Sequence, residues 1–191
     1  MSTAALENDY YTCADVYSWD EDFRAEIIDG IIYEMAPPST AHQDISRELF
    51  VYLCNYLKGK TCKAYAAPFG VRLFPRKDLS DDTLVEPDIV VVCDPSKIDE
   101  KGCNGAPDLI IEILSPSTSR KDKKIKFQVY QRAGVKEYWI VDPESRIVQV
   151  HILDNGNYIT TVYDEDDEVK VSVLDECVVA LKEVFPALTG E

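Results

Sequence analysis

Two short apolar runs that each carry one acidic residue constrain the fold of this chain more than any other feature. Residues 87–92 (PDIVVV) place Asp88 at the start of the first run, and residues 109–113 (LIIEI) place Glu112 near the end of the second. Uninterrupted apolar runs of this length are typical of strands buried on both faces. Because a buried carboxylate is costly without a partner, the pattern predicts two strands whose acids meet a positive group.

A lysine-rich segment follows the second run and is predicted to form a helix that ends at Gly134. Its residues Asp122, Lys126 and Tyr130 are spaced four apart, so their side chains share one face. Asp122 is placed to pair with Lys126 and fix its direction, while Tyr130 could donate to a phosphate or anchor the helix. The helix thereby brings a lysine next to the two strands.

The two acids and the lysine suit a site that holds a hard divalent cation and acts on phosphate. If the strands are neighbours, Asp88 and Glu112 each offer one oxygen, and the Ile113 backbone carbonyl and water molecules complete the shell. Such a metal polarises a phosphodiester and lowers the pKa of an attacking water molecule. Lys126 would contact the scissile phosphate or orient the water as a compact point charge.

Composition places the chain among ordinary globular proteins. Its 191 residues suffice for one domain with a substantial core, and 46% of them are hydrophobic. No apolar run is long enough to span a membrane, and residues 1–9 lack the basic start and apolar stretch of a signal peptide. We therefore expect a cytoplasmic protein without membrane contacts.

The cysteines do not show the paired spacing of a zinc site, and no histidine lies near them in the sequence. A nucleophilic cysteine is also disfavoured, because it would need a nearby base. In a cytoplasmic protein we expect the cysteines to be reduced and to act as small apolar core residues. They are Cys13, Cys54, Cys62, Cys93, Cys103 and Cys177.

Charge argues against tight, non-specific binding to duplex DNA. The net charge is −15, whereas proteins that bind nucleic acid usually carry a basic excess. The distribution is uneven, however, because residues 164–168 (DEDDE) concentrate acid and residues 120–126 (RKDKKIK) concentrate base. The acidic segment is predicted to be a solvated turn, while the basic segment lies beside the predicted phosphate site.

Turn and capping signals divide the chain into strands and helices. Asp29-Gly30 predicts a hairpin, and Ser39 or Thr40 predicts the start of a helix that runs to Leu57. The remaining strands are predicted at residues 62–66, 69–74, 88–93, 109–114, 137–141, 147–153, 158–163 and 169–173. Polar connections are predicted at residues 75–84 and 94–107, and a short final helix at residues 178–185.

This order predicts a mixed α/β fold with a central mixed sheet flanked by helices and an antiparallel C-terminal meander. We expect a single domain over residues 20–185, preceded by a lead-in at residues 1–19 and followed by a tail at residues 186–191. In the meander, His151 alternates with apolar residues and is predicted to lie at the surface or at a sheet edge. Tyr138 and Trp139 are predicted to be core residues.

Six short motifs occur in an order that resembles the Uma-type restriction endonuclease family of the PD-(D/E)XK nuclease superfamily. The resemblance covers roughly residues 20–185 and rests on the number, order and spacing of the motifs, each of which is weak alone. They are residues 26–30 (EIIDG), 36–39 (APPS) with His42, 87–90 (PDIV), 112–117 (EILSPS), Lys126 with Tyr130, and 133–143 (AGVKEYWIVDP).

The resemblance implies a restriction-endonuclease-like fold and a magnesium-dependent endonuclease that hydrolyses DNA phosphodiester bonds, with manganese as a substitute metal. It also implies a homodimer. By position, Asp88 and Glu112 match the two acids of the superfamily motif. The usual lysine position, two residues after the second acid, is Leu114 here, so the resemblance implies Lys126 in its place. Glu26 and His42 match further positions of the family and are implied to line the same cleft.

Other interpretations remain open at this point. Asp88 alone could cap a turn, Glu112 could be a strand-end surface acid, and Lys126 could belong to a solvated basic run. His42 could be a simple hydrogen-bonding residue near a helix start, and Glu26 could pair with a nearby base. The alternative function is a non-catalytic binding or regulatory module that keeps the nuclease fold and cleft. Hydrolysis of another phosphorylated substrate is a third possibility.

Overall fold

The computed structural model describes residues 10–19, 24–35, 37–115 and 121–185. Within these residues the chain forms two six-stranded sheets and a small two-stranded one. The central sheet has the order β12-β11-β10-β9-β6-β3, in which β9 and β10 are parallel and the other neighbours antiparallel. Its strands are β3 (Lys63–Ala66), β6 (Ile89–Val92), β9 (Leu109–Ile113), β10 (Glu137–Asp142), β11 (Ile147–Asp154) and β12 (Asn157–Asp164).

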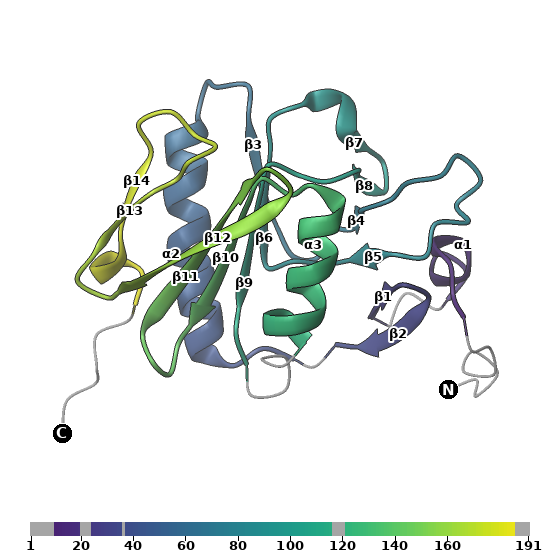
Figure 1. Cartoon of the computed structure of the whole chain (residues 1–191), viewed down its shortest axis with the longest axis horizontal. Coiled ribbons are helices and arrows are strands. Elements are labelled where there is room, and N and C mark those ends of the chain that lie inside the picture. The colour runs from purple at the N-terminus through teal and green to yellow at the C-terminus, as the bar shows by residue number, and fades with distance from the viewer. Residues whose placement is uncertain (1–9, 20–23, 36, 116–120, 186–191) are drawn as a thin grey trace.

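The central sheet is covered on both faces, which explains its apolar strands. Figure 1 shows helix α2 (Thr40–Leu57) behind this sheet and helix α3 (Phe127–Ala133) in front of it. Successive strand residues point to opposite faces, so Ile89 and Val91 pack on the side of α2, and Val90 packs on the side of α3. The α2 side chains in this layer are the predicted stripe, namely Ile45, Leu49, Leu53 and Leu57.

The helix boundaries largely follow the capping signals. Ser39 caps α2, since its side chain accepts a hydrogen bond from the His42 main-chain N–H. Gly134 ends α3 with a φ of 84°, a left-handed conformation that glycine adopts without strain. Before α3 the chain forms η3 (Lys121–Lys126), a π-helical segment with a wider turn. The predicted capping segment at residues 116–119 lies outside the described residues.

The second sheet packs beside α3 and was only partly predicted. Its order is β2-β1-β5-β4-β8-β7, and the hairpin of its first two strands turns at Asp29-Gly30 as predicted. The segments predicted as connections contain strands of only two or three residues, too short to leave a periodic pattern. The bounds are β1 (Ala25–Ile28), β2 (Ile31–Glu34), β4 (Val71–Arg72), β5 (Leu84–Val85), β7 (Ile98–Asp99) and β8 (Gly102–Asn104), with the 3-10 turn η2 (Pro95–Lys97).

The described part of the lead-in packs on the second sheet. Helix α1 (Cys13–Val16) buries Cys13 against Ile27 and Leu84. The main-chain N–H of Tyr11 donates to Gly30 O over 2.8 Å. The boundary between lead-in and domain at residue 20 stays a prediction.

The predicted C-terminal helix is wrong for most of its length. β13 (Glu168–Lys170) pairs with β14 (Val178–Ala180), and one 3-10 turn, η4 (Leu181–Glu183), follows. Val179 lies opposite Val169, and both are buried against the α2 side of the central sheet. The apolar residues therefore serve a short hairpin rather than a helix face.

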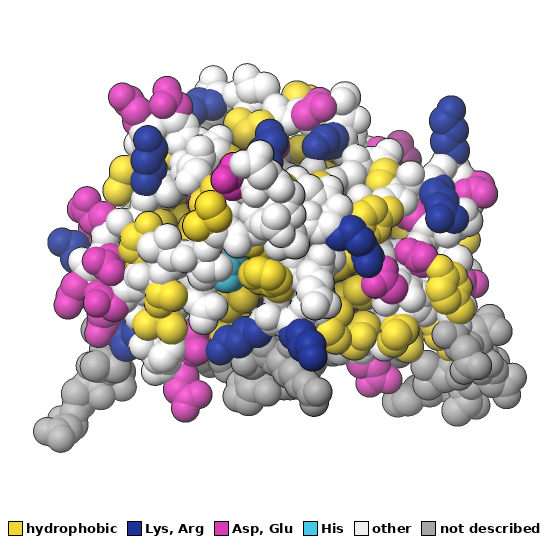
Figure 2. Space-filling model, viewed as in Figure 1, with side chains coloured by type: hydrophobic (Ala, Val, Ile, Leu, Met, Phe, Trp, Pro, Cys, Tyr) yellow, Lys and Arg dark blue, Asp and Glu magenta, His cyan; other side chains and the backbone are white. Residues whose placement is uncertain are grey.

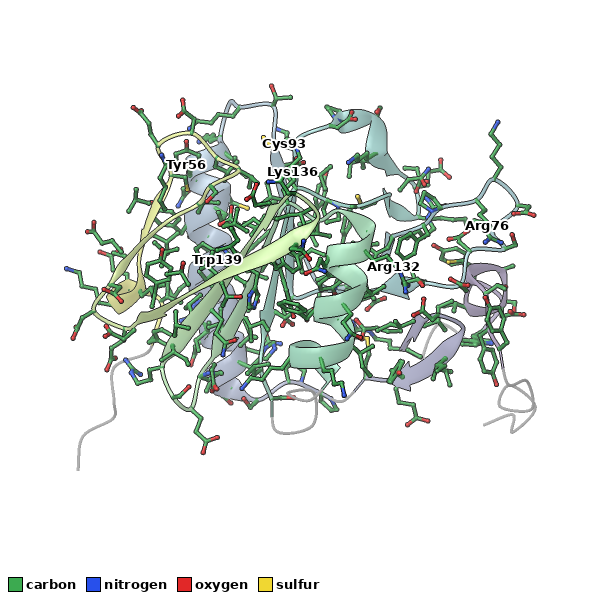
Figure 3. All side chains as sticks on the ribbon, viewed as in Figure 1. Tyr56, Arg76, Cys93, Arg132, Lys136 and Trp139 are labelled. Atoms are coloured by element: carbon green, nitrogen blue, oxygen red, sulfur yellow. A yellow bond between two sulfur atoms is a disulfide. The ribbon has the colours of Figure 1, made fainter. Side chains whose placement is uncertain are left out.

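Two of the cysteines were wrongly predicted to be reduced. Cys62 and Cys93 form a disulfide, because the antiparallel pair Lys63 and Val92 places the next residues opposite each other. Figure 3 shows Cys93 near Lys136 at one end of the central sheet. Asp108 links the two, since its carboxylate accepts from the Cys93 N–H and from Lys136 Nζ, both over 2.7 Å.

His151 is also a correction, because its side chain is buried rather than at the surface. Its Nδ1 lies 2.7 Å from Thr160 Oγ1, and the rings of Phe127, Tyr138 and Tyr158 surround it. Burial lowers the pKa of His151 to about 4. Tyr138 and Trp139 are fully buried, as predicted.

None of the described helices is long and apolar enough to cross a membrane.

We predict that His151 makes the fold sensitive to acid. The folded state keeps the imidazole neutral down to about pH 4, whereas the unfolded chain protonates it near pH 6.5. Stability is therefore lost as the pH falls between these values. Urea unfolding at about pH 6.5 and about pH 4.5 should show wild type losing about 2 kcal/mol more than His151→Phe. Equal losses in the two proteins would contradict a neutral buried imidazole.

Candidate active site

The strand register brings the two acids of the sequence motif together. Ile89 of β6 lies opposite Ile111 of β9 in an antiparallel pair. One further step along the register places Asp88 opposite Glu112, so both side chains leave the same face at the same end of the sheet. This is the neighbouring-strand arrangement predicted from the two apolar runs.

Asp88 is held by one strand and one helix. The Ile113 N–H donates to Asp88 Oδ2 over 2.7 Å, and His42 Nε2 lies 3.2 Å from the same oxygen. Burial lowers the pKa of His42, but its hydrogen bond with Asp88 and the charge of that carboxylate outweigh burial, so the pKa is raised. His42 lies in the first turn of α2, which Ser39 caps, and this turn meets Asp88 just before β6 begins.

Glu112 is held by two donors on the predicted helix face, one from η3 and one from α3. Lys126 Nζ lies 2.7 Å from Glu112 Oε1, and the Tyr130 hydroxyl donates to the same oxygen over 2.6 Å. Both donors are buried. The strand acid and the helix lysine thus form a direct ion pair inside the protein.

Lys126 is surrounded by carboxylates. Its Nζ lies 2.7 Å from Glu26 Oε1 and 3.7 Å from Asp122 Oδ1, in addition to Glu112. Glu26 comes from β1 in the second sheet and also accepts the Glu86 N–H over 3.0 Å. The ammonium group is therefore the point where the second sheet, β9 and η3 meet.

The electrostatics of this cluster favour a further positive charge. Burial raises the pKa of Glu112 well above its usual value; Lys126 opposes this shift, and the charges of Asp122, Asp88 and Glu26 add to it. Burial lowers the pKa of Lys126, but the three surrounding carboxylates outweigh burial and raise it well above its usual range. One lysine faces more negative charge than it can balance.

The cluster lies at the bottom of a cleft of about 180 Å³. Residues from the N-terminal part of α2, the end of β9 and the second sheet line it. Its outer lining includes Arg24, Pro37, Pro38, Gln43 and Ser115. A substrate group that enters this cleft would meet the acids and Lys126 at its floor.

All the predicted site residues lie in this one cluster, although their roles stay predictions. Direct contacts link Asp88 with His42, and Lys126 with Glu26, Glu112 and Asp122. Tyr130 contacts Glu112. Leu114, at the position where the superfamily motif would place its lysine, is buried in the apolar layer on the α3 side.

Sequence reasoning missed two contributors to the cleft. The Ile113 main chain was expected to act through its carbonyl, but its N–H already anchors Asp88. Arg24 lines the cleft and pairs with Glu86 at 2.5 Å. For this ion pair the available signal was sequence position, because Arg24 lies next to the motif at residues 26–30 and Glu86 next to the motif at residues 87–90.

We predict that Lys126→Met destabilises the fold because three buried carboxylates lose their shared cation. The expected cost is about 3 kcal/mol near neutral pH. The cost should shrink as the pH falls, because protonated carboxyl groups no longer repel each other. Urea unfolding at about pH 7 and about pH 5 measures both effects.

The matched control is Lys123→Met in the same helical segment, where the lysine is exposed and lies 3.6 Å from Asp142. It should change stability little. If Lys126→Met were as mild as Lys123→Met at both pH values, the buried ion cluster would not contribute to stability as argued.

Comparisons with known proteins agree with this fold and cleft. Residues 13–182 match the Uma2 family, described as "Putative restriction endonuclease". An uncharacterised protein of Synechocystis sp. is 29% identical over 157 residues, which cover 80% of each chain. A crystal structure described as a "putative nuclease belonging to DUF820" from Anabaena variabilis superposes with a TM-score of 0.73 at 26% identity, covering 92% of this chain and 97% of that one.

The expected restriction-endonuclease-like core is thus confirmed by a solved structure, and the family match spans most of the chain. The chain therefore belongs to the Uma2 family of restriction-endonuclease-like proteins.

Proposed function

We propose that this protein is a divalent-cation-dependent endonuclease that hydrolyses DNA phosphodiester bonds. The observation that carries the proposal is the meeting of Asp88 and Glu112 at one sheet end, with the buried Lys126 paired to Glu112. The family match and the solved relative support a nuclease. The metal, the DNA substrate and the roles of the residues belong to the proposal.

The free oxygens of the two acids support a metal between them. Both donors to Asp88 share Oδ2, and both donors to Glu112 share Oε1. Among the described residues, no hydrogen bond to the other oxygen of either carboxylate is found. Each acid therefore keeps one oxygen for a cation, and the excess negative charge of the cluster favours one.

The number of ligands points to magnesium rather than to a metal held in a protein cage. In the described part of the chain, no three histidine, cysteine or acidic side chains form a ready-made metal site. Mg²⁺ is commonly bound through one or two carboxylates and keeps several water molecules. Asp88 and Glu112, with the Ile113 carbonyl as a further candidate, fit that pattern, and Mn²⁺ would be a suitable substitute.

A bound cation would supply Lewis acidity and a more acidic water molecule at the cleft floor. The protein side chains hold the geometry for it. His42 and the Ile113 N–H fix one carboxylate, while Tyr130 and Lys126 fix the other. Lys126 also keeps a positive charge beside the place where a phosphate would lie, which favours the charge that develops during hydrolysis.

The proposed partner is DNA, and the proposed assembly is a homodimer, which would let two sites address two strands. The cytoplasmic location expected from the sequence stays a prediction.

The acidic character of the cleft favours a second candidate, a non-catalytic binding module. Among the described residues, five acids line the cleft, whereas Arg24, His42 and Lys126 are its basic residues, so attraction of a DNA backbone would depend on bound cations.

We predict that Glu112→Gln abolishes metal-dependent cleavage while keeping the shape of the side chain. The expected loss is on the order of 100-fold or more, because one of two metal-binding carboxylates is removed. Cleavage of supercoiled, linear and single-stranded DNA with Mg²⁺ or Mn²⁺ at low salt is the measurement.

Glu137→Gln is the matched control, since Glu137 is a buried acid on the neighbouring strand that accepts from Trp139 Nε1. It should retain cleavage. A folded wild type that cleaves none of these substrates would favour the binding module, and equal activity of Glu112→Gln and wild type would remove Glu112 from the site.

We also predict that His42→Ala weakens Mn²⁺ binding about 10-fold, because residues that orient a metal ligand typically contribute this much. Calorimetric titration with Mn²⁺ measures the affinity without any substrate. The control is His151→Phe, which removes the other buried histidine, one that contacts Thr160 rather than Asp88. Similar Mn²⁺ affinities in both variants would show that His42 does not position Asp88 for a metal.

A further inference from the structure

Strand β12 is the outermost strand of the central sheet, and its free edge is open. It pairs with β11 along all eight of its residues, and no strand of the described residues pairs with its other side. Figure 1 shows it crossing the front of the molecule beside α3. An edge strand of this length presents unpaired main-chain groups to other chains.

The register shows which main-chain groups face outward. The two-residue turn Asn155-Gly156 makes Asp154 and Asn157 a hydrogen-bonded pair, and such pairs recur at every second residue. The odd-numbered residues 157–163 therefore direct their main-chain groups toward β11, and the even-numbered residues 158–164 direct theirs outward.

The outward N–H groups are covered at both ends of the strand but not in the middle. The Tyr158 N–H donates to Gln131 Oε1, and the Asp164 N–H donates to Asp167 Oδ2. For the outward N–H and carbonyl groups of Thr160 and Val162, the described residues provide no hydrogen-bond partner. The open edge is thus centred on these two residues.

The side chains of this edge are unusual for an exposed strand. Ile159 and Val162 are 58% and 57% exposed, the highest values among the large apolar side chains that the structure describes. No charged residue or proline lies between Asn157 and Tyr163, although such residues are what natural edge strands use to prevent pairing. In Figure 2, few charged side chains lie over β12, whereas acidic ones gather near β13 and β14.

We propose that β12 pairs antiparallel with β12 of a second copy of this chain, about a two-fold axis at Thr161. This register sets Thr160 opposite Val162 of the other copy, and the reverse, so the open groups of both copies satisfy one another. The proposal deepens the homodimer part of the proposed function by giving its surface, and it does not depend on catalysis.

Charge and side-chain pairing favour a second copy as the occupant. A chain with net charge −15 repels its own copies over most of its surface, but this strand has no charge between its ends. The register also places Ile159 against Tyr163 of the other copy, and an aromatic residue opposite a β-branched one is a favourable cross-strand pair.

Site-directed crosslinking tests both the surface and the register. In a Cys54→Ser background, which removes the exposed free cysteine, Thr161→Cys should form a disulfide-linked dimer under mild oxidation. Residue 161 would face its own copy in a non-hydrogen-bonded pair, where Cα atoms lie about 4.5 Å apart, within disulfide range. Val162→Cys is the control, because it faces Thr160 and should not crosslink to itself.

Sedimentation equilibrium of the unmodified chain gives an independent measurement without metal or DNA. Wild type should show a concentration-dependent dimer. Val162→Lys should sediment as a monomer while its circular dichroism spectrum shows that it is folded, and Ile31→Lys should still dimerise. Ile31 is a fair control because it is 54% exposed on β2, at the edge of the other sheet.

The proposal is overturned if wild type is monomeric at every concentration, if Val162→Lys still dimerises, or if the two cysteine variants crosslink equally. A dimer with these properties would stand even if the protein cleaved no DNA. Conversely, a monomer that cleaves DNA would leave the nuclease proposal intact and remove this one.

Discussion

The buried ammonium group of Lys126 is the contact on which the site geometry depends. It joins Glu112 of β9, Glu26 of β1 and Asp122 of η3, which belong to three separate parts of the fold. A lysine at such a depth persists only with charge partners, and the carboxylates likewise need the lysine. The same cluster that holds the second sheet and α3 against the central sheet therefore leaves surplus negative charge at the cleft floor. That surplus is the physical basis for proposing a cation there.

A lysine that approaches from the helix, as proposed for Lys126, builds the site differently from a lysine on the strand. On the strand, the usual position is taken by Leu114, which fills the apolar layer under α3. From the helix, Lys126 approaches Glu112 together with Tyr130, so that both donors share one oxygen and the other oxygen is left free. Asp88 is arranged in the same way, because the Ile113 N–H and His42 both contact its Oδ2 and leave its other oxygen free. Each acid is thus oriented by two donors, which is how proteins fix the ligands of a metal.

The sequence predicted the parts of the fold that depend on local patterns. The hairpin at Asp29-Gly30, the helix capped by Ser39 and the stop at Gly134 each follow from one or two residues with a definite backbone preference. The site cluster was predictable because the spacing of Asp122, Lys126 and Tyr130 fixes one helix face. What failed depends on pairing between distant segments. The disulfide of Cys62 needs the register of β3 with β6, and the burial of His151 needs α3 to cover its face of the sheet.

Locating the metal in a crystal tests the central claim most directly. Crystals soaked in Mn²⁺ and measured at wavelengths above and below the manganese absorption edge give an anomalous map that is independent of activity, substrate and oligomeric state. The account predicts one strong peak between the free oxygens of Asp88 and Glu112, with Lys126 still bound to the other oxygen of Glu112. A cleft without a peak, or a peak held by other side chains while these two acids stay bound only to their present donors, would contradict it.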